Sequence, residues 1–294
     1  MNKTLAQEGY ISHAGMRLRY VSWGAPDAPV IVALHGLRSY AYTWEPVAAE
    51  LKDRYRVIAL DQRGRGLSDW DPQCNYYAEA YVGDLAALVE ALALSRFVLL
   101  GHSMGGASAL VYSGRFPEKL AAVVLEDMGP GASAGSQGSD RIKRELLATP
   151  PSFDNWADAR AFWRRQRASI SEAALDSRVL HSLKEDDDGR IVWRHDAAGI
   201  AAARLSSTPD QLVDLWPYVR QNSTPMLVVR GGDSDFLSQQ TAREMVRVNP
   251  GIQLAEIAGA SHYVHDDQLD SFNRTLREWL DDLSGKLWAE KSDK

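Results

Sequence analysis

The stretch VLLGHSMGGASAL, residues 98–110, predicts a strand, a sharp turn and a helix in that order. Aliphatic residues come first, and small, helix-forming residues follow a glycine-rich cluster with Ser103 at its centre. Gly101, Ser103 and Gly105 form a G-x-S-x-G motif, in which a strained serine backbone brings its neighbours too close together for side chains. Ser103 is therefore either a nucleophile or merely a small residue in a tight turn.

Short apolar runs on both sides of this stretch predict a parallel sheet. They lie at residues 29–36, 55–64, 96–101, 120–127, 225–231 and 252–259. Residues 16–24 alternate apolar and polar positions, as a half-exposed edge strand does. Helical patterns separate the runs, at 43–53, 76–94, 239–250 and 269–283. This alternation predicts the α/β class, with a doubly wound, mostly parallel sheet and ligands at the carboxyl ends of its strands.

An insertion interrupts the α/β pattern. Residues 129–140 read GPGASAGSQGSD, and the following ninety or so residues are rich in helix formers, arginine and tryptophan. We therefore expect a core domain of residues 1–130 and 223–285 and a helical cap of residues 131–222. The small residues at 131–139 suggest a hinge for a mobile cap. The polar residues after 283 predict a frayed tail.

Composition and charge exclude several classes of partner. The net charge is −6 without a basic stripe, so neither nucleic acid nor an anionic membrane surface is expected as a partner. Membrane insertion is not expected, because no apolar run approaches the roughly 20 residues that a spanning helix needs. Cys74 is the only cysteine, and the N-terminus lacks the apolar centre of a signal peptide. These features favour a cytoplasmic enzyme, a monomer or homodimer, acting on a small molecule.

A nucleophilic serine needs a base and two backbone donors. His262, in the loop IAGASHYVHDD after the last predicted strand, is the candidate base, and His265 is its competitor, more simply explained as a loop residue. The N–H groups of Leu37, in LHGLRS, and Met104 are the candidate oxyanion donors. The histidines do not show metal-ligand spacing, so no metal is expected.

Taken together, these motifs resemble the α/β-hydrolase superfamily, in its esterase and lipase-like branch. HGLRS, LDQRGRGLSDW, GHSMGG, LEDMGP, RGGDSDFLS and GASHYVHDD follow one another in the order that superfamily shows. The resemblance implies a serine nucleophile at an elbow between strand and helix, no cofactor, and hydrolysis of a small carboxylic ester through an acyl-enzyme. Hydrolysis of a lactone, an amide or a carbon–carbon bond stays an alternative, as does a non-enzymatic, receptor-like binding protein.

The acid is where the chain departs from the commonest pattern of the superfamily. Most members carry an aspartate three residues beyond a glycine after the next-to-last strand, and Ser234 occupies that place here, flanked by Asp233 and Asp235. Some small bacterial esterases instead carry the acid after the strand that follows the nucleophile helix, where this chain has Asp127. We favour Asp127, with Ser234 as its support. Asp235 and Asp233 remain alternatives, and Asp127 could instead be a turn cap.

Arg38 is a further candidate, because it follows the predicted oxyanion strand directly. It could bind a substrate carboxylate, or it could pair with an acidic residue of the cap such as those in KEDDDG, residues 184–189. Aromatic residues at helical spacing in the cap, including Trp156, Phe162 and Trp163, are expected to pack the cap onto the core. The residues that line the pocket cannot be assigned from the sequence.

Overall fold

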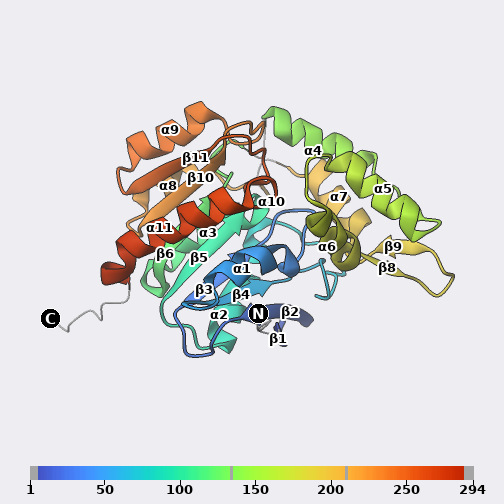
Figure 1. The fold of residues 1–294 in the computed structure, drawn as a ribbon, viewed down its shortest axis with the longest axis horizontal. Coiled ribbons are helices and arrows are strands. Elements are labelled where there is room, and N and C mark those ends of the chain that lie inside the picture. Colours follow the sequence, from blue (N-terminus) through green and yellow to red (C-terminus); the bar gives the residue numbers. More distant parts are fainter. Residues whose placement is uncertain (1–5, 133–134, 209–210, 288–294) are drawn as a thin grey trace.

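A large central sheet organises the chain, of which the computed structural model describes residues 6–132, 135–208 and 211–287 (Figure 1). Its eight strands run in the order β1-β2-β4-β3-β5-β6-β10-β11. They are β1 (Gln7–His13), β2 (Met16–Trp23), β3 (Val30–Leu34), β4 (Arg56–Leu60), β5 (Phe97–His102), β6 (Leu120–Glu126), β10 (Met226–Gly231) and β11 (Ile252–Ile257). Within this sheet the six strands β4, β3, β5, β6, β10 and β11 pair in parallel with their neighbours, which confirms the predicted parallel sheet.

The antiparallel end of the sheet differs from the expectation. Residues 16–24 were expected at the edge, but β1 pairs antiparallel with β2 along its whole length and takes that place. The two strands are joined at Ala14 and Gly15, whose φ angles of 50° and 76° fit a tight hairpin. Most residues of β1 are exposed or half-buried. The edge assignment of 16–24 is therefore wrong, because a largely polar strand leaves little apolar pattern in the sequence.

Helices cover both faces of the sheet. On one face lie α2 (Ala78–Ala91), α3 (Met104–Arg115), α8 (Trp216–Gln221) and α9 (Gln239–Val248). The other face carries α1 (Glu45–Leu51) and α11 (Leu269–Leu287). Short turns of helix connect these elements: η1 (Ala41–Trp44), η2 (Pro117–Lys119) and α10 (Val264–Asp267). Each face therefore has its own buried core, with Leu85 and Leu110 on one side and Leu51 and Phe272 on the other.

The inserted cap is not purely helical. It contains α4 (Gln137–Leu147), α5 (Trp156–Gln166), α6 (Glu172–Ser182) and α7 (Ala197–Leu205), which lie together at the right of Figure 1. It also contains an antiparallel sheet of three short strands in the order β7-β9-β8: β7 (Ser152–Phe153), β8 (Leu183–Glu185) and β9 (Ile191–Trp193). The expectation of helices alone is corrected here, because strands of two or three residues are too short to show a period.

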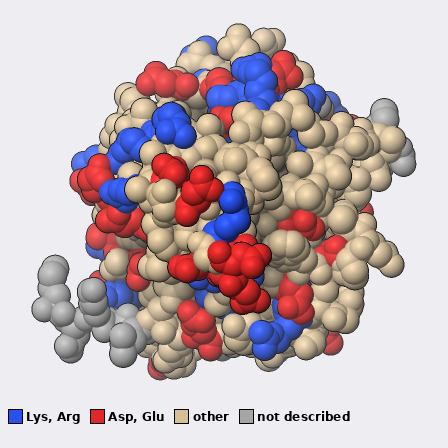
Figure 2. Space-filling view, turned by 90° about the vertical axis from the view of Figure 1, so that its right-hand side faces the viewer, with Lys and Arg blue, Asp and Glu red and all other residues tan. Residues whose placement is uncertain are grey.

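The cap has a core of its own, in which Phe153, Phe162, Trp163 and Trp193 pack edge to face. The aromatic residues therefore hold the cap together more than they attach it to the sheet. Exposed ion pairs of Arg160 and Arg164 with acids of α6 cross its surface. Acidic and basic side chains intermingle on this side of the molecule (Figure 2).

The boundaries of the insertion also shift. α8 falls inside the expected 131–222 cap but packs against α3 and α9 of the core. The expected hinge at 131–139 includes residues 133 and 134, outside the described residues, and α4 begins within it. The predicted tail lies outside the described residues from 288 onward. In the described part of the chain, no helix has the length and apolar character to cross a membrane.

Candidate active site

Ser103 lies in a strained turn where β5 gives way to α3. Its φ of 53° and ψ of −118° are unusual for a residue with a side chain. A Cβ at Gly101 would lie 2.4 Å from the carbonyl oxygen of Gly105, and a Cβ at Gly105 would lie 2.4 Å from that of Leu34. Both glycines of the motif are therefore required by backbone packing, as the sequence predicts.

His262 connects Ser103 to a carboxylate. Its Nε2 lies 2.9 Å from the Ser103 Oγ, and its Nδ1 lies 2.7 Å from the Asp127 Oδ2. All three side chains are buried. Burial lowers the pKa of His262, so the ring is held neutral. A proton on Nδ1 then bonds Asp127, and Nε2 accepts the hydrogen bond of the serine hydroxyl.

Asp127 sits directly after β6 in a positive-φ conformation, at 48°. Its Oδ2 also accepts a hydrogen bond of 2.5 Å from the Ser234 Oγ, and its Oδ1 accepts one of 3.1 Å from the Gly231 N–H. Burial raises the pKa of Asp127, while the Ser234 and Gly231 donors act in the opposite direction by stabilising the charged form. Ser234 thus contacts Asp127 directly, in the position that the sequence analysis assigned to it.

The two alternative acids point elsewhere. The carboxylate of Asp235 accepts two hydrogen bonds from Arg141 of α4, at 2.8 and 3.0 Å. Hydrogen bonding to Arg141 lowers the pKa of Asp235. Asp233 is exposed. Asp127 therefore contacts His262 directly, while Asp235 binds the cap.

His265, the competing histidine, belongs to a second buried group beneath the first. Its Nδ1 lies 2.8 Å from both carboxylate oxygens of Glu126, and its Nε2 lies 3.0 Å from the Thr43 Oγ1. Burial lowers the pKa of His265, but Glu126 and Asp266 raise it more, so the net shift is upward. His265 thus links α10 to β6 and η1, and His262 is the histidine that contacts Ser103.

The two candidate oxyanion donors lie beside the serine. Met104 is the first residue of α3, where helix geometry leaves backbone N–H groups without intrahelical partners. A Cβ at Gly36 would lie 3.4 Å from the Ser103 Cβ, so the backbone leading into Leu37 runs close to the serine. Leu37, Ser103 and Met104 all line one cavity. Their placement is compatible with an oxyanion site.

Arg38 contacts the cap instead of this cavity. Its Nη1 lies 3.2 Å from the Glu145 Oε2 of α4, and its guanidinium lies 5.3 Å from the centre of the Trp163 ring. Of the two roles that the sequence allowed for Arg38, the structure favours an ion pair with a cap acid. That acid is Glu145, not one of the run at 184–189.

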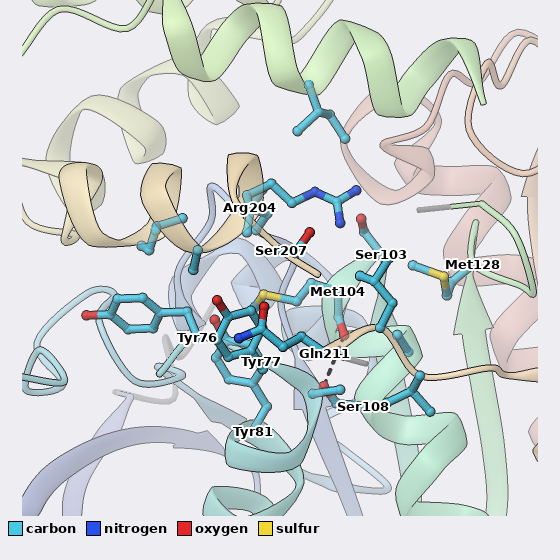
Figure 3. A pocket seen from close by; sticks show the side chains of 18 of the residues that line it. Tyr76, Tyr77, Tyr81, Ser103, Met104, Ser108, Met128, Arg204, Ser207 and Gln211 are labelled. Atoms are coloured by element: carbon cyan, nitrogen blue, oxygen red, sulfur yellow. Dashed lines mark hydrogen bonds between the residues drawn. The ribbon is translucent and has the colours of Figure 1, made fainter. Parts of the chain in front are cut away.

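The cavity beside Ser103 has a volume of about 130 Å³, comparable to a site that holds benzene. Its walls come from the core, the cap and the segment after α7, and most are apolar or aromatic, including Leu37, Ile142, Met128, Phe236, Ile200, Leu215, Tyr76, Tyr77 and Tyr81. Figure 3 shows Arg204 extending from α7 toward Ser103. Apart from Leu37, sequence reasoning did not identify these residues, because their positions depend on how the cap folds back over the core.

A model of the alpha/beta hydrolase family matches residues 31–275. The chain belongs to this family. In the described part of this alpha/beta hydrolase, no group of three or more His, Cys, Asp or Glu side chains could hold a metal ion.

Several relatives of this alpha/beta hydrolase carry the names of hydrolases. It is 28% identical to 2-(acetamidomethylene)succinate hydrolase of Mesorhizobium japonicum over 87% of this chain and 89% of the relative. It is 28% identical to N-formylmaleamate deformylase of Pseudomonas putida, over 95% and 98% of the two chains. An esterase of Mycobacterium tuberculosis is 29% identical, over 88% and 85%.

Solved structures confirm the fold of this alpha/beta hydrolase. The crystal structure of E-2-(acetamidomethylene)succinate hydrolase superposes with a TM-score of 0.84 at 25% identity, covering 94% of this chain and all of the other. An alpha/beta hydrolase from Novosphingobium aromaticivorans gives a TM-score of 0.79 at 28% identity, with 94% and 98% covered. The resemblance stated from the sequence motifs is thereby confirmed at the level of family and fold.

Proposed function

We propose that this alpha/beta hydrolase is a serine hydrolase that cleaves small carboxylic esters through an acyl-enzyme. The observation that supports the proposal most is the continuous hydrogen-bonded series Ser103, His262 and Asp127, whose members follow the carboxyl ends of β5, β11 and β6. A base within 2.9 Å of a hydroxyl, itself oriented by a carboxylate, is the arrangement that activates serine for acyl transfer.

The proposed reaction begins when the Ser103 Oγ attacks the ester carbonyl and His262 Nε2 takes the hydroxyl proton. The N–H groups of Leu37 and Met104 stabilise the negative oxygen of the tetrahedral intermediate. Collapse breaks the bond to the alcohol, which leaves with the proton from His262. Water then attacks the acyl-enzyme with His262 again as base, releasing the acid and restoring Ser103. Asp127 stabilises the imidazolium in both halves of the reaction.

The size and lining of the cavity favour a small substrate. A cavity of about 130 Å³ accommodates a short acyl group or one ring. Its apolar walls contribute binding free energy by removing hydrocarbon from water. A small ester is therefore the proposed ligand, without a cofactor.

Amide hydrolysis with the same residues is the second candidate. The observation that favours it is the likeness to N-formylmaleamate deformylase along 95% of this chain. The proposed chemistry differs only in the leaving group, because His262 must then protonate an amine instead of an alcohol.

Labelling and turnover together test the proposal. A fluorophosphonate probe should label the wild type at Ser103 and leave Ser103→Ala unlabelled. Hydrolysis of p-nitrophenyl butyrate should fall about a thousandfold or more in Ser103→Ala, because only binding and the oxyanion donors then remain. Label on another serine, with Ser103→Ala still active, would reject the mechanism. Faster turnover of p-nitrobutyranilide than of the ester would favour the amidase alternative.

A further inference from the structure

The cap binds the residues around the proposed base. In this histidine segment, residues 261–267, the Asp267 Oδ1 accepts a hydrogen bond of 3.0 Å from the Nη2 of Arg167, the residue directly after α5. The Nη1 of Arg167 lies 3.5 Å from the Oδ2 of Asp266, which Arg178 of α6 also binds. None of these four side chains is more than 10% exposed. Water therefore screens the pairs little, and they hold the cap against the segment.

Arg167 acts on both neighbours of His262. On one side, the Asp267 carboxylate that pairs with Arg167 also accepts hydrogen bonds from the Ser261 backbone N–H, at 2.9 Å, and from the Ser261 hydroxyl. On the other side, the Arg167 guanidinium lies 3.6 Å from the centre of the Tyr263 ring, within the range of a cation–π interaction. One cap residue thus contacts the chain before and after the base.

Tyr263 extends this contact to the imidazole itself. Its ring meets the His262 ring edge to face, with 5.1 Å between the ring centres. The core instead fixes the main chain of the segment. The His102 Nε2 lies 2.9 Å from the His262 carbonyl oxygen. The Glu126 carboxylate accepts from the His265 backbone N–H at 2.9 Å. The core therefore places the backbone of the segment, and the cap bears on the side chains around the ring.

The proposed reaction makes a strict demand on the His262 ring. Its two nitrogens must face Ser103 and Asp127 at once, as they do at 2.9 and 2.7 Å. A misplacement of about 1 Å caused far from the chemistry can cost about 100-fold in rate. A side chain that restrains both neighbours of the base can therefore control the rate without touching the substrate.

We propose that Arg167 is a positioning residue, which aligns His262 for proton transfer by binding Asp267 and covering Tyr263. The seating of the cap on the core then controls the chemical step as well as the shape of the cavity. This inference rests on the proposed serine hydrolase function and adds a residue to the machinery of that same site. Arg167 acts through its neighbours and takes no part in bond breaking.

The first experiment separates kcat from KM in the purified protein at pH 8. In Arg167→Gln, kcat for p-nitrophenyl butyrate should fall about tenfold or more, because the base is less well aligned. KM should stay within about twofold, since His262 serves both halves of the reaction and both slow together. Arg165→Gln removes the same charge from an exposed position of α5 and should leave both constants unchanged.

Arg167→Lys separates geometry from charge. Burial and, to a smaller extent, the charges of Arg141 and Arg167 lower the pKa of His262, so at pH 8 the ring is neutral with or without the Arg167 charge. Lysine keeps that charge but lacks the planar fork that pairs with Asp267 while lying over Tyr263. Its kcat should therefore lie between those of the wild type and Arg167→Gln. This variant also decides the question if Arg167→Gln does not fold.

Two further measurements report on the base without ester turnover. The rate at which a fluorophosphonate labels Ser103 should fall in Arg167→Gln by about the same factor as kcat. In proton NMR spectra, the His262 Nδ1–H that bonds Asp127 should give a far-downfield signal, assigned by its loss in Asp127→Asn. That signal should shift or broaden in Arg167→Gln and stay unchanged in Arg165→Gln.

Other roles for Arg167 give different results. If Arg167 only stabilises the fold, the melting temperature should fall while kcat, the labelling rate and the downfield signal of the folded variants stay at wild-type values. If loosening the cap anywhere were enough, Asp235→Asn, which breaks another ion pair between core and cap, should lose as much kcat as Arg167→Gln. Either result, or a folded Arg167→Lys with wild-type kcat, would overturn the inference. Failure of the serine hydrolase proposal is distinct, because Ser103 of the wild type would then not be labelled.

Discussion

Two aspartates at the ends of adjacent strands take opposite orientations in this protein. Asp127 follows β6, and Asp235 lies in the loop after its neighbour β10. Asp127 is fully buried and contacts His262, whereas Asp235 is partly exposed and binds Arg141 of the cap. Strand position brings a carboxylate near the site, while the partner that the carboxylate faces determines what it can do there.

Ser234 explains how the two orientations coexist. It fills the space beside Asp127 and donates to its carboxylate at 2.5 Å. The same oxygen accepts from the backbone N–H groups of Phe236 and Leu237, at 3.0 and 3.3 Å, which fixes the loop. With a hydroxyl at that position, the neighbouring Asp235 is left to turn outward. The loop after β10 thus supports the acid of β6 and also anchors the cap.

The largest expected effect is that of Asp127→Asn. An amide cannot stabilise the imidazolium or select its tautomer, so kcat for p-nitrophenyl butyrate should fall by about 10⁴-fold, the loss known for the serine-protease triad. Asparagine tolerates the positive φ of this position, so the fold should survive, as circular dichroism would report. An active, folded Asp127→Asn beside an inactive, folded Asp235→Asn would reverse the comparison.

A smaller effect is expected from Ser234→Ala. Removing a hydrogen bond to a charged acceptor costs about 1.5–3 kcal/mol, so kcat/KM should fall by about 10-fold or more, while the Gly231 N–H still holds Asp127. Ser238→Ala is the matched control, because Ser238 caps α9 further along the same segment. It should lower the melting temperature and leave kcat/KM unchanged. Equal activity losses in both variants would exclude a specific role for Ser234.

The sequence alone predicted those elements whose conformation depends on residues adjacent to them in the chain. The run before Ser103 and the glycines around it predicted the strand, the turn and the following helix, because backbone crowding constrains each residue there. His262 was found for the same reason, as a loop residue after the last buried strand. Local constraints of this kind are readable without knowledge of the rest of the fold.

Features that depend on distant contacts were not readable. The sequence left Asp127 and Asp235 as competing acids, because only tertiary packing shows that Arg141 engages one of them. The cap sheet was missed because its strands have two or three residues each. Arg204 gave no signal at all, since its approach to Ser103 depends on how α7 lies over the core.

The smallest expected effect is that of Asp235→Asn, which alters the aspartate that binds the cap. Its ion pair with Arg141 is partly exposed, so its loss should cost at most about 1 kcal/mol and at most about fivefold in kcat/KM. Because Arg141 lowers the folded-state pKa of Asp235, the pair stabilises the protein above the ordinary pKa of 3.8. Urea unfolding should therefore show the wild type slightly more stable than Asp235→Asn at pH 7, and this difference should fade as pH falls through the lowered pKa. Asp233→Asn, at an exposed neighbouring position, should show no such difference. A difference that grew toward acid pH would contradict the assignment of Asp235 to the cap.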